Sequence, residues 1–103
     1  MSRQPEARLV ARILLALEAE VGGLWTKIHA SPFQRSGFPD IVGCLEGLFI
    51  ALEVKLPGND LSPLQEHMIH AIRTKGRGYA TRVSSVEEAV RFVKLALGKK
   101  RRY

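Results

Sequence analysis

The sequence has little of several features that would assign it to a specialised class of protein. Cys44 is the only cysteine, so no disulfide framework can form within the chain, which fits a reducing compartment. No apolar run approaches the roughly 20 residues that a membrane-spanning helix needs. Arg3, Glu6 and Arg8 interrupt the N-terminal segment before the apolar region of a signal peptide could form. We therefore expect an intracellular protein that does not cross a membrane.

The sequence also lacks internal repeats and low-complexity segments. A length of 103 residues is too short for two independent cores. Hydrophobic residues make up 46% and charged residues 25%, which is ordinary for a globular domain. Cys44 stands in an apolar run, so we expect it to be a buried structural thiol. The sequence predicts a single domain over residues 1–98, followed by a basic tail at residues 99–103.

What the sequence has in excess is positive charge. Lysine and arginine number 16 against 10 aspartates and glutamates, which gives a formal net charge of +6. Such a balance favours a polyanionic partner, although most charged runs are simply solvated surface. No helix-turn-helix or zinc-finger pattern supports sequence-specific readout. The candidate phosphate contacts, with Arg35 the first choice because its loop leads into Asp40, are Arg35, Lys27, Arg73, Lys75, Arg77, Lys99, Lys100, Arg101 and Arg102.

The spacing of apolar residues predicts the elements of the chain. Val10, Ile13 and Leu17 recur at helical spacing, and two glycines follow, so a helix is expected over residues 6–21. Short apolar runs bounded by glycine, proline and polar residues indicate strands. These strands are expected over residues 24–29, 40–45, 48–54 and 79–83.

Two capping boxes mark the starts of the other helices. Ser62 is suited to the N-cap, Pro63 to the first helical position and Gln65 to the third. Ser85 and Glu88 form the same pattern before the last helix. The two helices are then expected over residues 63–75 and 86–98, the second ending at Gly98.

The order of these elements is helix, three strands, helix, strand, helix. This order predicts an α/β domain with a central mixed sheet flanked by helices. The two middle strands are apolar on both faces, so we expect helices to cover the sheet on both sides.

Three charged side chains fall on one face of this sheet. Glu53 and Lys55 are two apart on a strand, so they point to the same side. If Glu46 and Gly47 form a two-residue turn, the numbers of paired residues add up to 93, and Asp40 lies opposite Glu53. Directly opposed residues have Cβ atoms about 4.5–5.5 Å apart. A slip of one residue would move Asp40 to the other face, so the interpretation depends on this register.

Two carboxylates at this distance repel each other unless a cation lies between them or one takes up a proton. Mg²⁺ suits two carboxylates, a backbone carbonyl and several waters. A metal ion lowers the pKa of water and polarises a scissile phosphate, and Lys55 can orient the attacking water. Taken alone, the Glu-x-Lys pattern is weak and favours a surface ion pair on an edge strand. The combination with Asp40 favours a metal-dependent nuclease.

Three segments together resemble the virus-type replication-repair nuclease (VRR-NUC) domain. They are GFPDI at residues 37–41, ALEVK at 51–55 and LSPLQ at 61–65. This family belongs to the PD-(D/E)XK, restriction-endonuclease-like superfamily, and its core has a similar order of elements. The resemblance extends from Glu6 to about Ala89 and implies a restriction-endonuclease-like fold.

The resemblance also implies roles for individual residues. Asp40 and Glu53 would bind the metal together with the backbone carbonyl of Val54. Lys55 would be the catalytic lysine. Gln65 matches the family's active-site glutamine, and it can serve the capping box as well.

The family carries a further glutamate near the start of its first helix, and Glu6 matches it best. At about 100° per residue, Glu6 falls on the same side of the helix as Val10 and Ile13. Glu20 lies near that side at the far end and is the second candidate. An acidic residue in a first helical turn is also favourable without any metal.

These observations predict a Mg²⁺- or Mn²⁺-dependent, structure-selective DNA endonuclease with no organic cofactor. Stand-alone members of the family resemble homodimeric cleavers of four-way junctions, so the resemblance implies Holliday-junction cleavage by a homodimer, in a prokaryotic or phage-infected cell. Two alternatives stay open. The chain could be a non-catalytic nucleic-acid-binding module, or a nuclease subunit targeted by a partner protein.

Overall fold

The computed structural model describes residues 4–29 and 35–101. Within these residues the element order is the predicted one. The helices and strands are α1 (Gln4–Glu20), β1 (Leu24–Lys27), β2 (Ile41–Leu45), β3 (Leu48–Val54), α2 (Pro63–Thr74), β4 (Tyr79–Val83) and α3 (Val86–Arg101). None of these helices is both long enough and apolar enough to cross a membrane.

The four strands form one mixed sheet in the order β1-β2-β3-β4. β1, β2 and β3 pair antiparallel, whereas β4 pairs parallel with β3. A parallel pair needs a crossover connection, and α2 supplies it between β3 and β4. The α/β class and the mixed sheet are confirmed.

The β2–β3 hairpin has the predicted register. Ile41 pairs with Leu52 and Leu45 with Leu48, so the paired numbers add up to 93. Glu46 and Gly47 have φ angles of 51° and 84°, and positive values at both central positions are what a type I′ turn requires. Asp40 and Glu53 are the next residues along the two strands, beyond the last pair.

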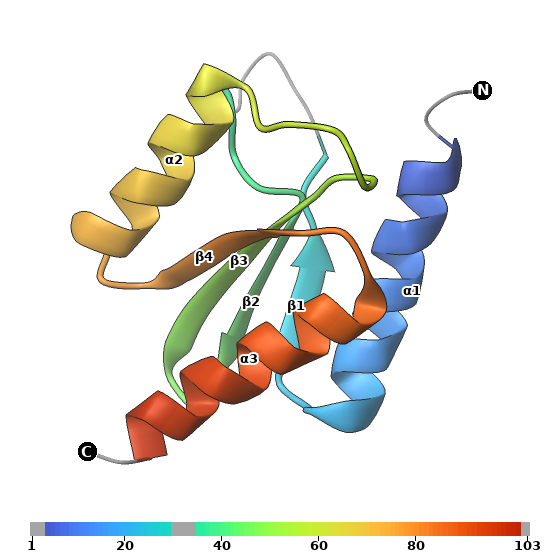
Figure 1. The fold of residues 1–103 in the computed structure, drawn as a ribbon. Helices are drawn as coiled ribbons and strands as arrows, with labels where there is room; N and C mark the ends of the chain where they lie inside the picture. The colour runs from blue at the N-terminus through green and yellow to red at the C-terminus, as the bar shows by residue number, and fades with distance from the viewer. Residues whose placement is uncertain (1–3, 30–34, 102–103) are drawn as a thin grey trace.

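The helices lie on both sides of the sheet. Figure 1 shows α1 and α3 together on one side and α2 on the other. Ile50, Leu52 and Val54 of β3 point into the main core under α1 and α3. On the opposite face, the small side chains of Ala51 and Ala80 leave room for a second apolar cluster under α2. Alternate residues of β3 therefore serve two separate clusters.

Helix α2 covers only part of its face, so the expectation of a sheet covered on both sides is half right. The apolar contacts of α2 are mainly with β3 and β4. Beside them, a groove of about 430 Å³ runs over β1 and β2, and its walls include Leu24, Val42, Cys44 and Phe49. We call these four residues the uncovered half-sheet. Cys44 is exposed there, so the prediction of a buried thiol is wrong, because none of the helices in the described residues packs on this half.

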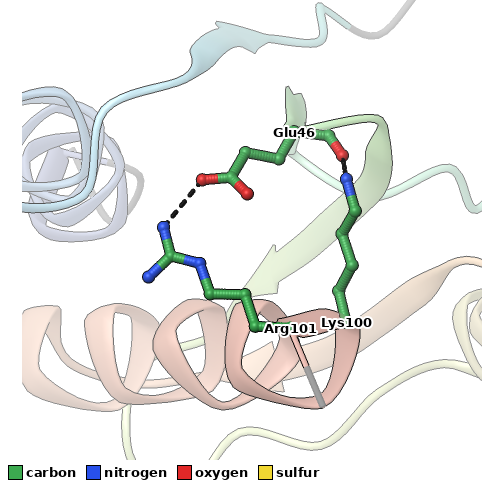
Figure 2. A network of polar contacts seen from close by, with 3 residues as sticks. All are labelled: Glu46, Lys100 and Arg101. Atoms are coloured by element: carbon green, nitrogen blue, oxygen red, sulfur yellow. Dashed lines mark hydrogen bonds and ion pairs between the residues drawn. The ribbon is translucent and has the colours of Figure 1, made fainter. Parts of the chain in front are cut away.

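Residues 99–101 of the predicted basic tail belong to a helix. Helix α3 continues through Gly98 to Arg101, so the predicted stop at Gly98 is wrong. The contacts in Figure 2 explain the extension. The Lys100 amino group donates to the carbonyl of Glu46, and Arg101 forms a 2.8 Å ion pair with the Glu46 carboxylate. The last turn of α3 is thereby fastened to the β2–β3 turn.

Candidate active site

Asp40 directly precedes β2, and two hydrogen bonds hold it in position. Its carbonyl accepts a hydrogen bond from the N–H of Ile28 at 2.7 Å, which continues the pairing of β1 with β2. Its carboxylate oxygen Oδ2 accepts a hydrogen bond from the N–H of Val54 at 2.9 Å. The carboxylate therefore reaches across to the end of β3, as the hairpin register predicts.

Glu53 is a charged residue in a buried position, with 3% of its surface exposed. Burial is the main cause that raises the pKa of Glu53 to about 8, and the charge of Asp40 and a hydrogen bond with it add to the increase. The charge of Lys55 acts in the opposite direction. Ionising two neighbouring carboxylates in a buried site is energetically unfavourable, because the charges repel and lose their hydration. Without a cation, the pair therefore retains a proton near neutral pH.

Gln65 joins the capping box and the carboxylate pair. Its Oε1 accepts a hydrogen bond from the N–H of Ser62 at 2.8 Å, and its own N–H donates to Ser62 Oγ at 3.2 Å. Because Oε1 is occupied by the cap, the amide Nε2 faces Glu53 and donates to its Oε2 at 3.2 Å. The capping box is confirmed, and the active-site role of Gln65 stays a prediction. The cap fixes the orientation of the amide that contacts Glu53.

The close approach of the loop before β2 to α2 was not predicted from the sequence. Gly37 has a φ of +80°, and a Cβ built on it would lie 2.6 Å from the carbonyl oxygen of Leu64. Phe38 packs against the cluster under α2, and Pro39 is fully buried. This contact brings Asp40, which follows the loop, close to Gln65. A glycine before Pro-Asp was the available signal, since a close backbone approach requires a residue without a side chain.

Lys55 continues β3 by one residue. Its N–H donates to the carbonyl of Val83 at 3.0 Å, which extends the parallel pairing with β4. Its side chain is partly buried, and its charge lowers the pKa of Glu53, so the ammonium lies within electrostatic reach of the carboxylate pair. Asp40, Glu53, Lys55 and Gln65 are therefore gathered at one end of the sheet, on the face that carries α2.

Glu6 is the more distant of the predicted residues. It lies half-exposed in the first turn of α1, and its charge makes the smallest contribution to the pKa of Glu53. Among residues 4–29 and 35–101, no three histidine, cysteine, aspartate or glutamate side chains are close enough to hold one metal ion. Glu6 thus adds to the negative field without joining the carboxylate pair. Glu20 lines grooves between α1 and α3 instead.

The nine candidate phosphate contacts differ in whether the protein itself already binds them. Three are already engaged within the protein: Lys100 and Arg101 bind Glu46, and Arg73 Nε donates to the carbonyl of Ala80 at 2.8 Å. Arg102 lies outside the described residues. The others have exposed side chains and stand at the ends of elements or in loops: Lys27, Arg35, Lys75, Arg77 and Lys99.

The residues at this site fit a hard divalent cation. Asp40 and Glu53 supply carboxylate oxygens. Burial, and next the charge of Asp40, raise the pKa of Glu53, and a cation would favour its ionised form. In an extended strand the N–H and C=O of one residue point to the same side, and the N–H of Val54 faces Asp40, so its carbonyl is turned to that side as well. Few carboxylates, a carbonyl and waters are typical of Mg²⁺ or Mn²⁺.

Comparison with solved structures places this fold beside two related chains. One, described as "VRR_NUC domain", is 26% identical, with a TM-score of 0.71 over 86% of this chain and 94% of the other. A second, described as "VRR_NUC domain protein", is 15% identical, with a TM-score of 0.64 over 87% of this chain and 85% of the other. Neither a family model nor a curated protein matches the sequence. The fold is that of VRR_NUC domains, which confirms the resemblance found in the motifs.

Proposed function

We propose that this chain, which has the fold of a VRR_NUC nuclease domain, is a Mg²⁺- or Mn²⁺-dependent DNA endonuclease that hydrolyses phosphodiester bonds. One observation carries the proposal. Asp40 and Glu53 share a face at the end of the hairpin, and the Nε2 of Gln65 contacts Glu53 at 3.2 Å. A module that only binds nucleic acid has no need of a buried carboxylate whose pKa is raised to about 8.

Asp40, Glu53 and the Val54 carbonyl would hold the ion, and the ion would supply charge neutralisation and Lewis acidity when bound. The remaining roles belong to the side chains around them. Lys55 would orient the attacking water and offset charge that develops on the phosphate oxygens. Gln65 holds Glu53 in position through its amide. The Val54 N–H keeps the Asp40 carboxylate turned to β3.

The proposed substrate is branched DNA, with a four-way junction as the first choice. A single centre of this kind cuts one strand. A symmetric dimer presents two centres to two strands and joins two basic surfaces into one. The net charge of +6 supports a phosphate-rich partner, and the motif resemblance supports the junction.

A cleavage panel tests this proposal. Linear duplex, 5′ flap, splayed arm and four-way junction are incubated with the protein and Mg²⁺. We expect metal-dependent cutting that Asp40→Asn and Lys55→Ala each reduce by about 100-fold or more, because each removes a group that stabilises the transition state. Glu87→Gln and Lys94→Ala are matched controls on the exposed face of α3 and should cut like the wild type.

Cutting that survives both Asp40→Asn and Lys55→Ala would rule out this active site. Equal rates on all four substrates would contradict the junction preference while leaving the nuclease intact. Light scattering at working concentration, with and without junction DNA, tests the homodimer. A monomer in both conditions would contradict the paired arrangement.

A further inference from the structure

Arg82 is a charged residue within a strand of the sheet, and the proposed chemistry does not use it. It lies on β4 in register with Glu53 of β3, and its side chain is only partly exposed. A guanidinium is always charged and offers five N–H donors in a planar fork, so in a partly buried place it needs acceptors. Its acceptors here are backbone carbonyls of the loop between β3 and α2.

The guanidinium makes three hydrogen bonds to two carbonyl oxygens. Nε and Nη2 donate to the carbonyl of Asn59 at 3.1 and 2.7 Å, and Nη2 also donates to that of Leu56 at 3.3 Å. The N–H of Asn59 donates to the same Leu56 carbonyl at 3.1 Å, which closes a tight turn. We call residues 56–59 the Arg82-bound turn. Arg82 ties both of its ends to β4.

The Arg82-bound turn has few other attachments to the protein. Its residues after Leu56 are exposed, as is Asp60. Leu56 packs against the core under α1 and α3, whereas Leu61 packs against the cluster under α2. Apolar contacts thus hold the two flanks of the loop, and the guanidinium holds the part between them.

The position of this turn matters because functional residues stand on either side of it. Lys55 directly precedes the turn, and Gln65 follows it through the Ser62 cap of α2. Arg82 lies in register with Glu53, yet its three hydrogen bonds do not go to the carboxylate pair. The donors of Arg82 are turned to the loop instead.

We propose that Arg82 is a positioning residue of the nuclease site: by holding the Arg82-bound turn on β4, it fixes Lys55 and Gln65 against Glu53. This inference rests on the proposed function. A lysine cannot replace the arginine, because one ammonium point charge does not bind two carbonyls with the geometry of a planar fork. A misplacement of about 1 Å in a catalytic group can reduce a rate by about 100-fold.

The test compares Arg82→Ala, Arg82→Lys and Arg82→Gln with Arg91→Ala, a matched control on the exposed face of α3. Single-turnover cleavage gives the rate of the chemical step, and titration without cleavage gives the DNA affinity. Thermal unfolding with and without Mg²⁺ reports metal binding. Hydrogen exchange reports the mobility of Lys55 and Gln65. Added guanidinium ion tests rescue of Arg82→Ala.

We expect kcat to fall about 10- to 100-fold in all three Arg82 variants, with DNA affinity and the stabilisation by Mg²⁺ nearly unchanged. Guanidinium ion should restore part of the rate, and exchange should quicken at Lys55 and at residues 56–61. Arg91→Ala should match the wild type in each measurement.

Other outcomes overturn the inference. Full activity in Arg82→Lys with weaker, less salt-dependent DNA binding in Arg82→Ala would make Arg82 a phosphate contact. If the Arg82 variants lose both kcat and the thermal stabilisation by Mg²⁺, the site is damaged in general and Arg82 has no specific positioning role. If kcat is unchanged, Arg82 does not position the site at all. If the wild type cuts no DNA, the proposed function fails, whereas faster exchange confined to the loop would still show that Arg82 holds it.

Discussion

At the scale of single residues, Glu53 is the residue whose charge most reduces the stability of the metal-free fold. Its pKa is about 8 in the folded chain, compared with 4.5 for an ordinary glutamate. Between these values the folded state binds more protons than the unfolded state, so the free energy of unfolding falls as pH rises from about 4.5 to about 8 and levels off above. The metal-free protein should lose up to a few kcal/mol over this window, which urea titrations at a series of pH values measure.

The control for this prediction is Glu53→Gln, which keeps the size of the side chain and removes its charge. The variant should lose most of the pH dependence in this window and be more stable than the metal-free wild type at pH 8. Mg²⁺ binds the folded state and displaces the proton, so its stabilising effect on the wild type should grow with pH. A wild type and a variant with parallel stability curves would contradict the assigned cause.

Gly37 provides a second prediction at this scale. In Gly37→Ala a Cβ would lie 2.6 Å from the Leu64 carbonyl, at a residue with a φ of +80°. The loop must retreat from α2, which separates Asp40 from Gln65, so cleavage should fall at least about tenfold. Gly22→Ala has a similar φ of +84° but meets nothing within 4 Å, so it serves as the control for backbone strain alone. Equal effects of the two variants would argue against the close-approach role.

The carboxylate pair could be predicted from the sequence because its geometry follows from covalent spacing. A two-residue turn sets the register, and the register decides which residues face each other. The hydrogen bond from the Val54 N–H to Asp40 and the contact of Gly37 with Leu64 could not be predicted. They depend on how a loop and a helix pack in three dimensions, and no local pattern in the sequence encodes that distance.

At the scale of elements, the start of α2 combines a structural role with a functional one. Ser62→Ala removes the acceptor of the Gln65 N–H, which should cost about 0.5–2 kcal/mol of stability. The Ser62 N–H remains and keeps the Gln65 amide oriented, so cleavage should persist. Gln65→Ala should cost similar stability and reduce cleavage strongly. Thermal melts paired with single-turnover rates separate the two effects.

Ser85→Ala is the matched control for this prediction, because Ser85 Oγ accepts from the N–H of Glu88 at the start of α3, and α3 lies on the other side of the sheet from α2 (Figure 1). It should destabilise the protein like Ser62→Ala and leave cleavage unchanged. A large loss of cleavage in Ser62→Ala at a temperature where it stays folded would mean that the hydroxyl has a role beyond the cap.

The ends of elements were the least predictable part of the fold. Glycine often ends a helix, so a stop at Gly98 was expected. Helix α3 continues beyond it because Lys100 and Arg101 bind Glu46, a residue more than 50 positions earlier in the chain. Cys44 was expected to be buried because its strand is apolar on both faces. Helix α2 has 12 residues and does not extend over β1 and β2, so that half of the sheet stays exposed. Contacts distant in sequence decide both cases.

At the scale of the whole molecule, the net charge of +6 should govern the affinity for DNA. The logarithm of the binding constant falls linearly with the logarithm of salt concentration, with a slope set by the number of phosphates neutralised. Lys27→Ala, Arg35→Ala and Arg77→Ala remove exposed cations and should each reduce the slope by about 1. Binding isotherms at several salt concentrations, on junction and duplex DNA, provide the measurement.

Arg101→Ala is the control for these variants, because it removes a cation that is already paired within the protein. Its guanidinium is paired with Glu46 at 2.8 Å, so its loss should change the salt slope little. Stability should fall only slightly, because both groups are largely exposed and solvent screens the ion pair. A slope that drops as much for Arg101→Ala as for Lys27→Ala would show that DNA displaces the ion pair.

The uncovered half-sheet has a consequence for the behaviour of the protein in solution. β1 is an edge strand of four residues, and on the face that it shares with β2 and β3, Leu24 of β1 and Phe49 of β3 expose 76% and 42% of their surfaces. Open edges with apolar neighbours promote strand-to-strand aggregation, and a charged residue at the edge opposes it. Lys27 ends β1 and is exposed. It therefore acts as a gatekeeper, and Lys27→Ala should lower the concentration at which the protein precipitates, in addition to its effect on DNA.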